Sequence, residues 1–220
     1  MSEIRLTIAG EDVRLLPERA LFWQRACTLV VADVHWGKAA TFRAAGIPIP
    51  GGATADDLAR LDSAIHRTGA RRLVVLGDLF HAKAGRVATR TLATLRGWRE
   101  RCTGLEIQLV RGNHDRHAGD PPEDLRINCV NSPAFLPPFV LRHEPRESAE
   151  GYTLAGHLHP ALVMSGPALQ RERLPCFLVR PGVTILPAFG SFTGTAGVIP
   201  ESADRVFVVA DGEVLAAASL

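Results

Sequence analysis

The chain has 220 residues, of which 46% are apolar and 22% charged, close to the average for a soluble globular protein. This length predicts a single domain over residues 1–220, large enough to bury a core without disulfide or metal staples. The 25 basic residues nearly cancel the 23 acidic ones, and the formal net charge of +2 excludes a strongly basic arm that binds nucleic acid by bulk charge. A local phosphate site remains compatible with this balance.

The cysteines and the N-terminal residues indicate a cytoplasmic protein with reduced thiols. The four cysteines lie far apart and contain no C-x-x-C pair, so they predict neither a zinc site nor a disulfide framework. Residues 1–15 alternate apolar and polar side chains and lack the basic start and apolar run of a signal peptide. No stretch approaches the ~20 apolar residues that cross a bilayer, so we expect no membrane association.

The first half of the chain alternates predicted strands and helices. Alternating apolar residues on either side of the turn-like residues 10–12 predict an opening hairpin. Thr54 and Asp57 form a capping-box pattern, which predicts a helix that starts there and ends at Gly69. The other expected elements are strand 28–34, helix 38–45, strand 73–76, helix 87–102 and strand 105–110.

The second half changes character, because short apolar runs alternate with Gly and Pro turns and helical periodicity is hard to find. The predicted strands there are 139–143, 152–155, 176–179, 183–186, 206–209 and 214–217.

Polar clusters occur at five places, most of them directly after a predicted strand. They are Asp33-x-His35, Gly77-Asp78, Gly112-Asn113-His114-Asp115, His143, and Gly156-His157-x-His159. Taken alone, each has an ordinary interpretation as a turn, an Asx-type loop or a hydrogen-bonded histidine. The last cluster is the least ordinary, because alternate positions on an extended segment point both imidazoles the same way.

Taken together, the clusters predict a metal site. Carboxylate, amide and imidazole are the ligand types expected for Mn²⁺, Fe²⁺ or Zn²⁺. The carboxyl ends of strands in open α/β sheets are also where sites are built. Two Asp, one Asn and four His are enough ligands for two ions, with His114 left over.

The order D-x-H, G-D, G-N-H-D, H and G-H-x-H over residues 33–159 resembles the calcineurin-like metallophosphoesterases. This resemblance implies a mixed α/β fold in which two β-sheets are sandwiched between helices, a four-layer αββα arrangement. Residues 32–48 further resemble the bacterial DNA-ligase-associated phosphoesterases. That subgroup resemblance implies a DNA substrate and a functional association with a DNA ligase and a helicase of a repair system.

The family resemblance also implies a role for each clustered residue. One ion would be held by Asp33, His35 and His159, and the other by Asn113, His143 and His157, with Asp78 bridging both. Mn²⁺ is the expected metal, with Fe²⁺ and Zn²⁺ as alternatives. Two ions ~3.5–4 Å apart share a hydroxide and clamp a phosphate for in-line attack. His114 would then contact the phosphate or protonate the leaving oxygen.

Residues around the ligand set have weaker indications. His81 occupies the position where protein phosphatases carry an Asp that orients the catalytic His, and here it resembles the DNA-nuclease branch, so we assign it a catalytic role. Asp115 is interpreted as a loop-stabilising residue. Four basic residues near the metal blocks are candidate phosphate contacts, and solvated surface positions are the alternative: Lys38, Arg43, Arg111 and Arg116.

The leading functional hypothesis is a dinuclear-metal-dependent phosphodiesterase that acts on DNA in repair, as an endonuclease or another nuclease. Only about 60 residues follow Gly156-His157-Leu158-His159, whereas familiar DNA nucleases of this family carry extra DNA-gripping regions. This favours an alternative substrate, such as a cyclic nucleotide or another small nucleotide-derived molecule. A third hypothesis is an inactive scaffold. The oligomeric state stays open.

Overall fold

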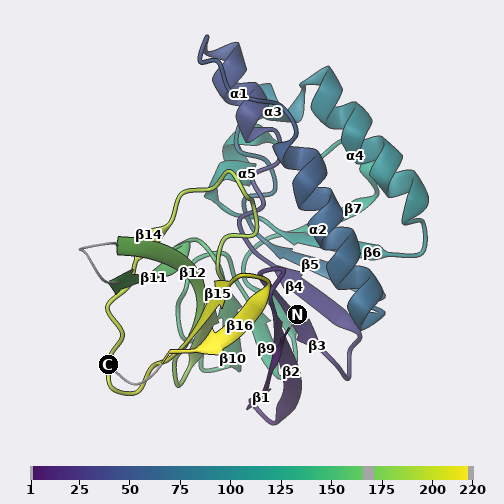
Figure 1. Ribbon diagram of the computed structural model, residues 1–220. Coiled ribbons are helices and arrows are strands. Elements are labelled where there is room, and N and C mark those ends of the chain that lie inside the picture. Colours follow the sequence, from purple (N-terminus) through teal and green to yellow (C-terminus); the bar gives the residue numbers. More distant parts are fainter. Residues whose placement is uncertain (1, 166–170, 218–220) are drawn as a thin grey trace.

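The computed structural model describes residues 2–165 and 171–217 and contains two β-sheets that face each other (Figure 1). The first sheet has seven strands in chain order: β1 (Ile4–Ile8), β2 (Glu11–Leu16), β3 (Ala20–Trp23), β4 (Thr28–Val31), β5 (Arg72–Leu76), β6 (Glu106–Val110) and β7 (Ile127–Val130). Strands β1 to β4 pair antiparallel and β4 to β7 pair parallel.

The second sheet has nine strands, and its main path runs β14-β11-β12-β13-β10-β9-β8, with β15 and β16 attached through β12. Its strands are β8 (Ala134–Leu136), β9 (Phe139–Leu141), β10 (Tyr152–Ala155), β11 (Pro160–Ser165), β12 (Arg171–Val179), β13 (Val183–Ile185), β14 (Ala196–Gly197), β15 (Arg205–Ala210) and β16 (Glu213–Ala216). The neighbours β9, β10 and β13 are parallel.

The helices of the described residues all lie between Lys38 and Leu125. They are α1 (Lys38–Ala44), α2 (Ala53–Thr68), α3 (Lys83–Arg86), α4 (Thr89–Arg101), α5 (Asn113–Ala118) and the 3₁₀ turn η1 (Glu123–Leu125). Helices α2 and α4 cover the outer face of the first sheet (Figure 1). Leu58, Leu61, Leu95 and Trp98 on these helices bury their side chains in one core cluster with Leu73 and other strand residues of that face.

A second apolar cluster fills the space between the sheets. Val30 and Leu76 on the inner face of the first sheet pack in it together with Phe139, Leu154 and Phe177 from the second. Strands β4 and β5 therefore bury both faces, which explains why their sequences are continuous apolar runs.

The expected mixed α/β fold with two β-sheets is confirmed, and the described helices all precede the second sheet along the chain. Within the described residues no helix follows Leu125. The outer face of the second sheet instead buries its own cluster, which includes Leu162, Cys176, Leu178 and Val208 from β11, β12 and β15.

Two local predictions differ from the structure. Helix α2 begins at Ala53 after Gly52 without a side-chain cap, because Thr54 and Asp57 already lie inside it. Asp57 instead accepts hydrogen bonds from Arg60 and from the backbone N–H of Ser191. The predicted helix 87–102 appears as α4, and the short helix α3, Lys83–Arg86, precedes it and was not predicted. Five short strands were not predicted: β3, β7, β8, β11 and β14.

The strand directions bring the polar clusters together at the carboxyl ends of the strands. The parallel strands β4, β5 and β6 of the first sheet end there, and so do β9 and β10 of the second. An isolated parallel bridge between Ala32 and Ala188 joins the two sheets at this point. No helix in the described part of the chain is long and apolar enough to span a membrane.

Candidate metal centre

Five of the predicted ligands adopt a left-handed backbone. Their φ values are 54° at Asp33, 51° at His35, 54° at Asp78, 72° at His157 and 48° at His159. This conformation costs a residue with a Cβ about 1–2 kcal/mol. Such strain persists only where the surrounding structure determines it, and it clusters at functional sites. The expectation of an extended His157–His159 segment is wrong, because both residues turn the chain and send their rings to different partners.

One group of side chains joins Asp33, His35 and His159, whose ligand-type atoms lie within 4.8 Å of one another. Asp33 is fully buried; its Oδ2 accepts the backbone N–H of His157 at 2.8 Å, while its Oδ1 has no hydrogen-bond partner. Nδ1 of His159 lies 3.1 Å from the carbonyl of Gly194, which makes Nδ1 the donor. Nε2 of His159 therefore faces Asp33 Oδ1, at 3.5 Å, with its lone pair.

A second group centres on His143. Its Nδ1 lies 3.0 Å from the carbonyl of Leu76 and is the donor in that pair. This hydrogen bond sets the tautomer and leaves the lone pair of Nε2 free, as an outer hydrogen bond does for a metal-binding histidine. Nε2 faces Asn113 Oδ1 at 2.8 Å and His157 Nδ1 at 3.0 Å.

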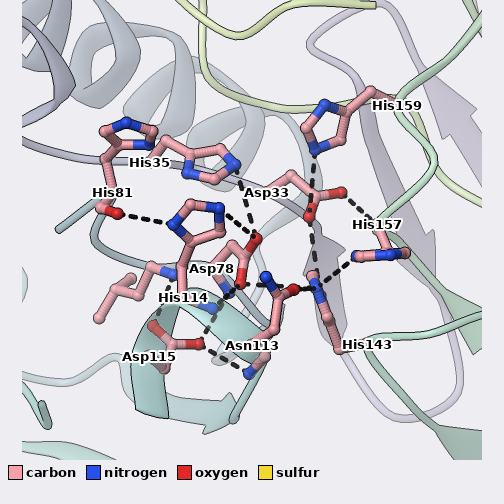
Figure 2. Close-up of polar contacts among 12 residues, drawn as sticks. Asp33, His35, Asp78, His81, Asn113, His114, Asp115, His143, His157 and His159 are labelled. Carbon is pink, nitrogen blue, oxygen red and sulfur yellow. Dashed lines mark hydrogen bonds and ion pairs between the residues drawn. The ribbon is translucent and has the colours of Figure 1, made fainter. Parts of the chain in front are cut away.

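Asp78 lies between the two groups (Figure 2). Its Oδ1 is 3.5 Å from His143 Nε2 and accepts the backbone N–H of His114 at 3.0 Å. Its Oδ2 is 3.7 Å from His35 Nε2 and 3.9 Å from His114 Nε2. The two oxygens of one carboxylate thus face the two groups separately.

Burial governs the protonation of the centre. It lowers the pKa of His35 to about 2, with further lowering by the nearby His114 and His159. Burial also raises the pKa of Asp78, although the His143 ring opposes that shift. For His159 burial favours the neutral ring, but the Asp33 carboxylate raises its pKa above the usual value. At pH 7 His35 is therefore neutral, the form that binds metals.

The residues present fit divalent ions. Asp33 Oδ1 and both ring nitrogens of His35 are buried and have no hydrogen-bond partner in the part of the chain that the structure describes. Around His143 Nε2, the Oδ1 atom of Asn113 and the Nδ1 atom of His157 converge at 2.8 and 3.0 Å. A cation satisfies both features, and mixed oxygen and imidazole donors suit Mn²⁺, Fe²⁺ or Zn²⁺. Two further groups share these atoms: Asp33, Asp78 and His143, and His35, His81 and His114.

Asp115 and two glycines contact the loops and side chains of the ligand residues. The Asp115 carboxylate accepts the backbone N–H groups of Asp78, Leu79 and Gly112 at 2.8, 2.9 and 2.8 Å, which agrees with its predicted loop-stabilising role. Gly77 has a φ of 80°, and a Cβ there would lie 2.2 Å from His143 Nδ1. A Cβ at Gly112 would lie 2.4 Å from Asp78 Oδ1, so close packing against the ligand side chains requires glycine at both positions.

His114 and His81 lie side by side at the mouth of the centre. Nδ1 of His114 is 2.7 Å from the backbone carbonyl of His81, which leaves Nε2 facing Asp78. The His81 ring stacks between His114, at 5.1 Å, and Phe42, at 6.1 Å. Burial and the Lys38 ammonium lower the pKa of His81 to about 4, so its ring is neutral at pH 7. His81 touches His114 through its carbonyl and its ring face.

The four predicted basic residues lie in different surroundings. Lys38 begins α1 beside His81, with its ammonium 5.9 Å from the centre of the Phe192 ring. Arg43 lies away from the ligand groups and donates to the carbonyls of Ile49 and Pro50. Arg111 forms a bidentate ion pair with Asp120, both N–O distances being 2.7 Å. Arg116 is exposed and lines a pocket next to the ligand groups.

That pocket contains residues that the sequence reasoning missed. It has a volume of about 150 Å³ and shares Asn113 and His143 with the second ligand group. Arg142 and Arg146 line it together with Arg116. Arg142 could have been predicted from the sequence, because it lies directly before His143. Arg111 and Arg116 were selected for the same reason, their position beside a predicted metal block.

The comparisons with known proteins agree with this architecture. Residues 28–171 match the family model described as calcineurin-like phosphoesterase. The crystal structure of the nuclease MPE from Pseudomonas putida is 41% identical, covers 97% of this chain and 100% of that chain, and has a TM-score of 0.85. The Escherichia coli phosphoesterase Yfce is 15% identical over 84% of this chain and 88% of its own, with a TM-score of 0.40. No curated protein is significantly similar to the chain.

Proposed function

The chain belongs to the calcineurin-like phosphoesterase family and is a metal-dependent phosphoesterase, and we propose that it is a DNA nuclease with two divalent ions, Mn²⁺ first among them. The 41% identity to a nuclease over nearly the whole chain supports the nuclease assignment. The repair setting, with a DNA ligase and a helicase as functional associates, is proposed from the resemblance of residues 32–48 to the ligase-associated subgroup.

The division of Asp78 between the two ligand groups carries the two-ion proposal. Its Oδ1 faces His143 and its Oδ2 faces His35, so one carboxylate serves both groups. Asp33, His35 and His159 would hold one ion, and Asn113, His143 and His157 the other. When bound, the ions would supply Lewis-acid stabilisation of the phosphoryl oxygens and a hydroxide nucleophile near neutral pH.

The protein side chains orient the ligands and move a proton. The carbonyls of Leu76 and Gly194 set the tautomers of His143 and His159. His114 uses Nδ1–H to bind the His81 carbonyl, so a protonated His114 presents Nε2–H towards the centre. With 37% of its side chain exposed, His114 can reach a substrate and donate that proton to the leaving oxygen.

A substrate panel with Mn²⁺-loaded protein tests the proposal. Single-stranded DNA, duplex DNA, a cyclic nucleotide and an aryl phosphodiester are compared for the wild type and for His114→Ala and Asp78→Ala. We expect DNA cleavage by the wild type, a rate loss of about 10²–10⁴ with metals retained in His114→Ala, and loss of both metals and turnover in Asp78→Ala. Activity confined to the cyclic nucleotide would overturn the DNA assignment.

A further inference from the structure

The pocket beside Asn113 and His143 has the charge of an anion site. Four arginines line it, Arg111, Arg116, Arg142 and Arg146, and the only acidic lining residue is Glu144. The Asp120 carboxylate neutralises Arg111 through its bidentate pair. Three guanidinium groups therefore face one carboxylate, which leaves the pocket with a net charge of about +2.

Arg142 is the most buried of these three arginines. Its side chain is half-buried, whereas Arg116 and Arg146 are exposed. Its guanidinium group also carries terminal N–H donors, and guanidinium groups pair most favourably with phosphate or carboxylate oxygens. The backbone N–H of Arg142 bonds to the Leu154 carbonyl of β10, so the residue is held rigidly beside His143.

We propose that this arginine pocket, made by Arg116, Arg142 and Arg146, binds a second phosphate of the substrate, next to the one that is hydrolysed. The inference rests on the proposed nuclease function and deepens it. A polynucleotide that places one phosphate at the ligand groups carries its neighbouring phosphate within reach of the adjoining pocket. A cyclic nucleotide has a single phosphate and leaves the pocket empty. The pocket thus selects phosphate chains over small phosphodiesters.

The experiment compares two substrates in Mn²⁺-loaded enzyme: a single-stranded oligonucleotide and bis(p-nitrophenyl) phosphate, which has one phosphate. The variants are Arg142→Gln and Arg146→Gln. Arg71→Gln is the matched charge control, because Arg71 is exposed just before β5, at the opposite edge of the sheet. Arg146 is exposed in the loop after β9, so its replacement leaves the fold intact even if Arg142→Gln is unstable.

We expect each pocket variant to lower the ratio of kcat/KM for the oligonucleotide to kcat/KM for the aryl ester by about tenfold, mainly through KM. Arg71→Gln leaves the ratio unchanged. The dependence of log KM on log salt concentration becomes shallower by about 0.7 for each phosphate contact removed. Ratios and salt slopes equal to the wild type in both pocket variants would overturn the inference.

A binding measurement separates this inference from the proposed function. Fluorescence anisotropy of a labelled oligonucleotide is recorded with the metal-depleted full chain, so it needs no turnover. We expect the dissociation constant to rise about tenfold in Arg146→Gln and to stay unchanged in Arg71→Gln. Loss of nuclease activity from the panel with this binding difference intact would count against the function alone. Equal binding by wild type and Arg146→Gln would refute the pocket.

Discussion

Replacement of Asp115 by asparagine tests how the loops of the metal centre are held. The Asp115 carboxylate is 2% exposed and receives three backbone N–H groups. Oδ2 accepts from Asp78 and Gly112, and Oδ1 accepts from Leu79. The asparagine side chain keeps one oxygen, which best replaces Oδ2, and its NH₂ group then faces the N–H of Leu79, donor against donor.

The expected loss of unfolding free energy follows from the number of hydrogen bonds that the substitution affects. A buried donor left unpaired costs about 1–3 kcal/mol. The two hydrogen bonds that remain lose their charge assistance, which is roughly half their strength, or about another 1 kcal/mol in total. We therefore expect Asp115→Asn to lower the free energy of unfolding by about 2–4 kcal/mol, a large share of the roughly 5–15 kcal/mol of a typical domain.

Urea denaturation of metal-depleted protein at pH 7 measures the effect without a contribution from bound ions. Asp56→Asn is the matched control, because Asp56 is exposed in the first turn of α2, where a charge contributes about 0.3–1 kcal/mol. Asp115→Asn should also retain less metal after reconstitution, since Asp78 is held through its N–H. A midpoint shift no larger than that of Asp56→Asn would refute the reasoning.

Three further outcomes are expected. Gly77→Ala should lower the melting temperature by several degrees, because the added Cβ would lie 2.2 Å from His143 in a left-handed backbone. Gly97→Ala should raise stability by about 0.5–1 kcal/mol, because the space around Gly97 in α4 is open. Equal shifts of the melting temperature in the two variants would contradict this expectation. Asp57→Ala should lower stability by about 1–3 kcal/mol in the same denaturation assay, because the N–H of Ser191 loses its buried acceptor, and an unchanged midpoint would count against it. Burial raises the pKa of Cys176 to about 12. Iodoacetamide at pH 8 should therefore leave this thiol intact in the folded protein and alkylate it in urea, as measured by mass spectrometry. Fast labelling of Cys176 in the folded chain would exclude its buried placement.

Local pattern predicted the parts of the fold that depend on nearby residues. The apolar runs of β4, β5 and β6 and the helical spacing of α2 appear in the structure close to their predicted bounds. Strand β3 was missed although its four residues, Ala20–Trp23, form a buried apolar run like those of β4 and β5. The predicted capping role of Thr54 is wrong because α2 already begins at Ala53, and Asp57 instead accepts the backbone N–H of Ser191, 134 positions away.

The same distinction between local sequence pattern and contacts of distant residues applies to the candidate metal centre. Residue types and their positions after strands predicted the candidate ligands, because residue chemistry and strand ends are local properties. The folded structure determines which atoms meet. Asp78 divides its oxygens between His35 and His143, and the backbone carbonyl of His81, not a ring nitrogen of His81, holds His114. The folded structure also determines that Arg111 is neutralised by Asp120, whereas Arg142 has a buried Nε with no partner among the described residues. These contacts depend on the distance between chain segments in space, which no pattern along the chain encodes.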